Sequence, residues 1–121
     1  MKCRIILELL AILFFTGCYN REQISRLDEA EALIQNKPDS ALTILQQLKS
    51  EGSQAEQARY ALLYSEALDK NHIKATNDSL IRRAWEYYKH HPKDLRRQCK
   101  TLYYWGRVKP VSYTHLRAHE T

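Results

Sequence analysis

Apolar residues recur at intervals of three and four through most of this chain, and this spacing limits the possible folds more than any other feature of the sequence. Five segments show it, within residues 24–34, 41–48, 55–67, 80–88 and 95–106. Such spacing gathers apolar side chains on one face of an α-helix, whereas a half-buried strand needs alternation at period two, which no segment keeps for long. The sequence therefore predicts an all-α protein.

The expected helix boundaries coincide with residues that favour helix starts and turns. Ser53 and Glu56 have the spacing of a capping box, in which each side chain accepts a hydrogen bond from a backbone N–H at the start of a helix. Residues 71–77 interrupt the apolar spacing and predict a loop, after which Asn77 or Asp78 is expected to cap the fourth helix. We therefore expect consecutive short helices joined by short connections.

The third expected helix has two apolar faces. One face consists of Tyr60, Leu63, Tyr64 and Ala67, and the other of Ala55, Ala58, Ala61 and Leu62. A helix at the edge of a protein needs only one apolar face. We therefore expect the third helix to have neighbours on two sides.

The first 17 residues have the composition of a secretory signal. Two basic residues precede an apolar run at 5–15, which is shorter than the roughly 20 residues that a membrane-spanning helix needs. We therefore expect residues 1–17 to be a cleaved signal peptide. The sequence Thr-Gly-Cys at 16–18 resembles the lipobox of bacterial lipoproteins, which implies that Cys18 carries the lipid and becomes the first residue of the mature chain.

The lipobox resemblance implies that the membrane is a partner, reached through the lipid on Cys18, and that residues 18–23 form a polar tether. Two or three acyl chains hold a protein firmly on a membrane. Tyr19 is not the aspartate that retains some bacterial lipoproteins in the inner membrane. We therefore expect the protein in the cell envelope, on the outer membrane.

Cysteine usage excludes a disulfide within the mature chain. Cys3 would leave with the signal peptide and Cys18 would be lipidated, so that only Cys99 remains. Cys99 shares an apolar spacing with Leu95 and Leu102, which predicts a small buried core residue.

The charge and the available side chains argue against two classes of function. The formal charge is +5, of which residues 1–17 contribute +1 from two basic residues and one acid, leaving +4 on the rest of the chain. These charges are scattered rather than gathered in a stripe, so we expect no nucleic-acid partner. The sequence shows no nucleophile with a base and no glycine-rich phosphate loop, so we expect no enzyme, no cofactor and no metal.

Three segments resemble the tetratricopeptide-repeat lipoproteins of Gram-negative gut anaerobes. They are Pro-Asp-Ser-Ala-Leu at 38–42, Ala-Arg-Tyr-Ala-Leu-Leu at 58–63 and, above all, Leu-Tyr-Tyr-Trp-Gly-Arg-Val at 102–108. The resemblance covers residues 24–109. It implies an α-solenoid of antiparallel helix pairs, TPR-like and incomplete at the C-terminus, which acts as a protein–protein interaction scaffold.

In such a solenoid the partner, a protein or peptide, would lie in the concave groove formed by the first helix of each pair. On the third helix the resemblance assigns Arg59, Tyr60 and Tyr64 to this groove. An array that ends at the fifth helix would also expose an apolar face around Leu102, Tyr103 and Trp105.

Aromatic residues towards the C-terminus suggest an alternative function. They are Trp85, Tyr87, Tyr88, Tyr103, Tyr104 and Trp105. Such residues either pack helices together or form a groove for a ligand. The second possibility corresponds to a glycan- or peptide-capture component of an outer-membrane uptake system.

Residues 110–121 do not continue the pattern of the preceding chain. Residues 111–121 can be back-translated, codon by codon, into a transposase sequencing adapter. We therefore expect residues 110–121 to be derived from the adapter and the natural chain to continue beyond Lys109 with further repeats. His115 and His119 have the one-turn spacing of a metal-binding pair, but in an adapter-derived segment this spacing has no function.

Overall fold

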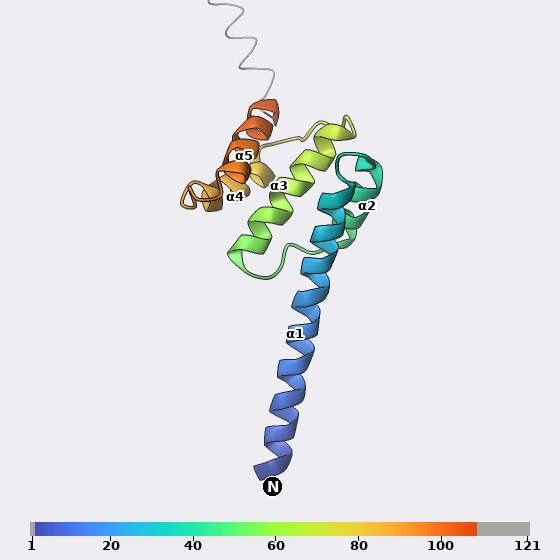
Figure 1. Ribbon diagram of the computed structural model, residues 1–121, viewed down its shortest axis with the longest axis vertical. Coiled ribbons are helices and arrows are strands. Elements are labelled where there is room, and N and C mark those ends of the chain that lie inside the picture. The colour runs from blue at the N-terminus through green and yellow to red at the C-terminus, as the bar shows by residue number, and fades with distance from the viewer. Residues whose placement is uncertain (1, 109–121) are drawn as a thin grey trace, which may run out of the picture.

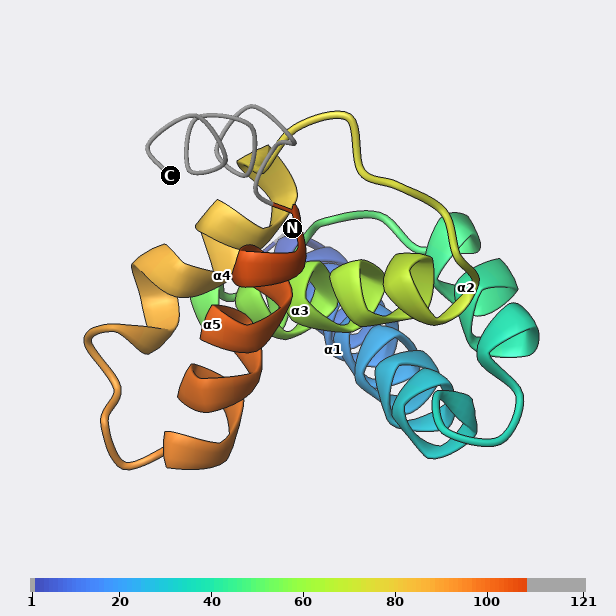
Figure 2. The same cartoon turned by 90° about the horizontal axis from the view of Figure 1, so that it is seen from above.

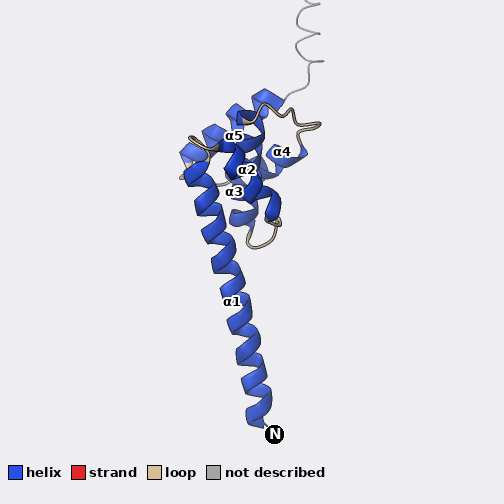
Figure 3. Ribbon diagram, turned by 90° about the vertical axis from the view of Figure 1, so that its right-hand side faces the viewer, coloured by secondary structure: helices blue, strands red, loops and turns tan. Residues whose placement is uncertain are grey.

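The computed structural model describes the backbone of residues 2–108 and the side chains of residues 3–10 and 21–108. Every regular element in this range is a helix (Figure 1 and Figure 3): α1 spans Lys2–Leu33, α2 Pro38–Gln47, α3 Gln54–Lys70, α4 Ser79–Tyr88 and α5 Leu95–Val108. The all-α class is confirmed. The predicted loop is also confirmed, because α3 and α4 are separated by residues 71–78.

The helix α3 lies at the centre of the folded body. It packs against each of the other described helices, with α1 and α2 on one side and α4 and α5 on the other (Figure 1 and Figure 2). The neighbours on two sides that the sequence predicts for this helix are therefore confirmed. The N-terminal part of α1 extends away from the body, and its residues 3–10 are exposed.

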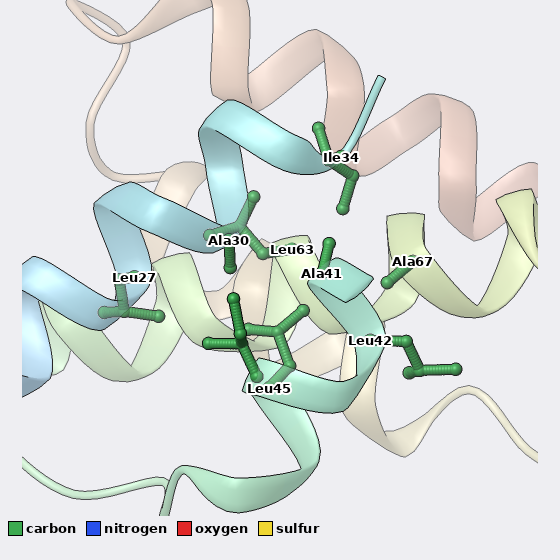
Figure 4. Close-up of a cluster of buried hydrophobic side chains, with 9 residues drawn as sticks. Leu27, Ala30, Ile34, Ala41, Leu42, Leu45, Leu63 and Ala67 are labelled. Atoms are coloured by element: carbon green, nitrogen blue, oxygen red, sulfur yellow. The ribbon is translucent and has the colours of Figure 1, made fainter. Parts of the chain in front are cut away.

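Two hydrophobic clusters, which share α3, form the core. The first core cluster, between α1, α2 and α3, contains Leu27, Ala30, Ile34, Ala41, Leu42, Ile44, Leu45, Leu63 and Ala67 (Figure 4). The second core cluster, between α3, α4 and α5, contains Ala58, Ala61, Leu62, Ile81, Ala84, Tyr88 and Tyr104. The alanines in both clusters let neighbouring helices approach closely. Each of the two apolar faces of α3 contributes residues to one of the clusters.

Helix starts follow the sequence signals in part. The Ser53 hydroxyl accepts a hydrogen bond from the backbone N–H of Glu56 (3.2 Å), as the capping box predicts. The reciprocal half does not form, because the Glu56 carboxylate lies over Gly52, where its buried Oε2 has no hydrogen-bond partner among the described residues. At α4, Asn77 Oδ1 accepts from the Ser79 N–H (3.0 Å), while the Asp78 carboxylate makes no capping bond.

The first helix begins earlier than the sequence analysis expected. It runs without a break from Lys2 through the expected tether at 18–23. A single glycine, Gly17, costs a helix only about 1 kcal/mol, and strong helix formers (Leu and Ala before this stretch, Arg, Glu and Gln after it) favour a continuous helix. Gln23, the last residue of the expected tether, is buried and donates to the carbonyls of Lys49 (3.0 Å) and Glu51 (2.8 Å). The folded body therefore begins no later than Gln23.

The prediction that Cys99 is a buried core residue of α5 is wrong. Cys99, predicted as a core residue, is exposed, and Leu95 and Leu102 on the same row are 62% and 49% exposed. The buried row instead contains Thr101 and Tyr104. Burial of Thr101 is tolerated because its hydroxyl donates to the Arg97 carbonyl one turn earlier (2.7 Å).

The apolar face expected at the end of the array is confirmed for two of its three residues. Leu102 and Tyr103 are 49% and 60% exposed. Trp105 is half-buried, because its indole packs near Trp85 (ring centroids 6.2 Å apart) and its Nε1 donates to Asp78 (3.1 Å). Gly106 faces open space, since a Cβ built there would meet no described atom within 4 Å.

Candidate binding cleft between α1, α3 and α5

Side chains from α1, α3 and α5 converge on a small cleft of about 60 Å³, which we name the ionic cleft. Its lining combines an apolar floor with charged walls: Glu31 from α1, Arg59, Leu62, Leu63 and Glu66 from α3, and Arg96, Arg97 and Lys100 from α5. The packing of α3 against both α1 and α5 brings these side chains together.

Arg59 connects α3 to α1. Its Nη2 forms ion pairs with Asp28 (Oδ1, 2.6 Å) and with Glu31. Burial lowers the pKa of Arg59, but the hydrogen bonds to Glu31 and Asp28 outweigh this effect and raise the pKa overall. Burial likewise raises the pKa of Glu31, yet the Arg59 hydrogen bond and the charges of Arg59, Arg97 and Lys100 lower it overall. Both groups are therefore held in their charged forms.

Arg97 extends this network to α5. Its Nη2 lies 3.5 Å from Glu31 Oε1, and its Nη1 lies 2.9 Å from Asp94 Oδ2. Tyr88 is buried beside these groups, and burial raises the pKa of its phenol to about 12 despite the opposing charge of Arg97. One ionic network thus joins three helices that are far apart in the sequence.

Glu66 is the most buried charged residue of the ionic cleft, with only 1% of its surface exposed. Lys100 Nζ lies 3.4 Å from both carboxylate oxygens, and Gln35 Nε2 donates to Oε1 (3.2 Å). The carboxylate also affects α5, because burial and the charge of Glu66 raise the pKa of Tyr104. A buried carboxylate needs such partners, since desolvation without them is costly.

The structure does not bring the three predicted groove residues together. Arg59 lines the ionic cleft, but Tyr60 and Tyr64 lie on the side of α3 that packs against the first core cluster. The Tyr60 hydroxyl donates to the Leu45 carbonyl (3.3 Å) at the end of α2. Arg59 therefore lies on a different side of α3 from Tyr60 and Tyr64.

Most of the residues that line the ionic cleft are not indicated by sequence patterns. Spacing does indicate one pair of these residues. Arg59 and Glu66 are seven apart, and residues with this separation share a face of a helix. On α5, Arg96 and Lys100 are four apart and lie on one side of the helix.

The aromatic residues near the C-terminus mainly pack helices together. Tyr88 and Tyr104 are buried in the second core cluster, against which Tyr87 and Trp105 pack. Of the six aromatic residues named above, Tyr103 is the one that is largely exposed.

A larger cavity of about 370 Å³ lies between the loop at 71–78 and the end of α5. The ion pair between Asp69 and Arg107 (2.7 Å) forms part of its wall. Val108, the last described residue, also lines this cavity. All residues that line the ionic cleft belong to α1, α3 and α5.

The remaining predicted sites concern the membrane and metals. Cys18 lies within α1, but its side chain is outside the described residues, as are His115 and His119. Between residues 2 and 108, no helix combines the length and the hydropathy that crossing a bilayer requires. In the same part of the chain, no group of three His, Cys, Asp or Glu side chains is placed to hold a metal ion.

Comparison with models of protein families, with curated proteins and with solved structures found no match to this chain.

Proposed function

We propose that this protein is a lipid-anchored helical-repeat scaffold, which binds another protein in the cell envelope. The observation that carries the proposal is the ionic cleft, because three helices that alternate in the sequence contribute to one solvent-accessible surface rich in Arg and Lys. Arginine is favoured at protein interfaces, where its planar guanidinium pairs with carboxylates of a partner.

A TPR-like solenoid accounts for this arrangement. In a solenoid, each helix pair packs on the next, and the first helices of successive pairs line one surface. The packing of α1 with α2 and of α3 with α4, together with the contacts of α3 with α1 and α5, supports this assignment of pairs. The first helices would then be α1, α3 and α5.

The extended N-terminal part of α1 supports the anchor. Cys18 precedes Gln23, which is buried against the body, by only five positions. A lipid on Cys18 would therefore hold the helical body close to the membrane surface. The proposed location is the outer membrane.

The anchor predicts that Cys18→Ala abolishes lipid attachment. Cells that express the full chain with a labelled fatty acid should incorporate label into the wild type and into Cys99→Ala, whose exposed thiol is the matched control. The Cys18→Ala protein should carry no label and should remain as an unprocessed precursor. Equal labelling of both alanine variants would contradict the anchor.

The scaffold predicts a defined protein partner. Full-length protein purified from envelope membranes should retain a partner that binds again when both proteins are pure, and Arg96→Glu should weaken this complex because it reverses a charge in the ionic cleft. Lys93→Glu, an equal charge change on an exposed residue outside the cleft, should not. Retention of oligosaccharide without protein would instead support the uptake alternative, and turnover of a substrate would contradict both.

A further inference from the structure

The connection between α2 and α3 lies at the end of the folded body that is nearest to Cys18. Gln23 fixes it there, because its side-chain amide donates to the carbonyls of Lys49 (3.0 Å) and Glu51 (2.8 Å). Figure 1 shows this connection at the end of the body from which the N-terminal part of α1 extends. Since α1 is continuous from Cys18 to Gln23, these two residues are separated by about 8 Å along the helix axis.

The start of α3 lies at the same end of the body. Two contacts between α1 and α3 show that the helices run side by side in the same direction: Arg59 with Asp28, and Glu66 with Gln35. Both contacts join residues that are 31 positions apart. Gln54, the first residue of α3, therefore lies near the level of Gln23 on α1.

The opposite end of the body contains the turn between α1 and α2 and the loop at 71–78. The two connections meet there, because the Asn71 side chain donates to the Pro38 carbonyl (2.9 Å). Leu33, the last residue of α1, is about 22 Å from Cys18 along the helix axis, and Asn36 follows in the turn. The body therefore has one end close to the proposed lipid and one end far from it.

The end close to Cys18 is polar. Its exposed residues include Arg21, Glu22, Lys49 and Glu51, which carry charges of both signs. Transfer of these charges into hydrocarbon would be costly, whereas the headgroup layer of a bilayer, roughly 5–8 Å thick on each side, is polar and hydrated. This surface suits contact with headgroups and not insertion among acyl chains.

We infer that the α2–α3 connection and the start of α3 lie against the lipid headgroups, so that α1 and α3 stand upright on the membrane. This inference rests on the lipid anchor of the proposed function, and it adds which surface of the body meets the membrane. The turn between α1 and α2 and the loop at 71–78 then point away from the lipid, where a soluble partner can reach them.

The test places one fluorophore at either end of the body. Gln54→Cys and Asn36→Cys each replace an exposed, neutral amide side chain. Both are made together with Cys99→Ala, which removes an exposed thiol. In the lipidated chain the introduced cysteine is then the one free thiol, because Cys3 leaves with the signal peptide and the Cys18 thiol carries the lipid.

The two lipidated proteins, purified from envelope membranes and labelled with a nitrobenzoxadiazole maleimide, are inserted into phosphatidylcholine vesicles. Part of the vesicles contain a lipid with a nitroxide on its headgroup, which quenches fluorophores near the membrane surface. The label at position 54 should lose about half of its fluorescence in these vesicles, because it lies close to the headgroup layer. The label at position 36 should keep its fluorescence, because it is more than about 20 Å from Cys18 along α1.

Flotation of the vesicles measures membrane attachment separately. If the protein floats with the vesicles but both labels are quenched equally, or the label at position 36 more strongly, the upright orientation is wrong while the anchor stands. If the protein does not float, the anchor of the proposed function fails and the orientation fails with it. Both variants should keep the thermal midpoint of Cys99→Ala, since neither Gln54 nor Asn36 forms a side-chain hydrogen bond within the described chain.

Discussion

Replacing Leu45 by alanine should lower the free energy of unfolding by about 2–5 kcal/mol, the range observed for leucine truncation in well-packed cores. Leu45 is fully buried and projects between α1 and α3, towards Leu27 and Leu63 (Figure 4). Its removal would leave a cavity at the point where three helices meet. Because small domains have total stabilities of about 5–15 kcal/mol, such a loss would remove a large part of the total.

Leu95→Ala is the matched control for this prediction. Leu95 is 62% exposed on α5, so the same truncation should change the free energy of unfolding by less than about 0.5 kcal/mol. Urea unfolding of the full chain, followed by circular dichroism, measures both variants. Similar losses for Leu45→Ala and Leu95→Ala would contradict the assignment of the core and would mean that the Leu95 row of α5 is covered in solution.

The contrast between α3 and α5 shows what apolar spacing determines. In α3 both apolar rows contribute to the core, because other helices pack on both sides, as the two-row pattern predicts; Ala55, at the start of the helix, is exposed. In α5 the row of Leu95 and Leu102 has the stronger apolar signal, yet the row of Thr101 and Tyr104 is buried. Spacing identifies the rows of a helix, but the neighbouring helices determine which row is covered.

The candidate site was harder to predict than the fold for a related reason. Arg59 and Tyr60 are adjacent in sequence, and adjacent residues on a helix point in directions about 100° apart. They therefore cannot both face one narrow cleft. Four of the residues that join Arg59 there come from α1 and α5, and their convergence with α3 depends on helix packing that no local pattern encodes. From spacing alone, only the position of Arg59 and Glu66 on one face of α3 could be predicted.

The buried carboxylate of Glu66 leads to a second large effect on stability. Lys100→Met should lower the free energy of unfolding by roughly 2–3 kcal/mol, because it removes the cation beside a carboxylate that is 1% exposed. The expected loss is smaller than for a fully enclosed pair, since the Lys100 side chain is 28% exposed. Lys93→Met, which makes the same change at an exposed position, should alter stability by less than about 0.5 kcal/mol.

A double-mutant cycle separates this electrostatic explanation from a simple loss of packing. Glu66→Gln keeps the shape of the side chain and can still accept the hydrogen bond from Gln35, so the double variant Glu66→Gln/Lys100→Met contains no unpaired buried charge. It should therefore be more stable than Lys100→Met alone, with a coupling free energy of about 1–3 kcal/mol between positions 66 and 100. Urea unfolding of the four proteins measures this coupling. Additive losses would show that Lys100 stabilises α5 by packing alone and that the carboxylate of Glu66 does not depend on it.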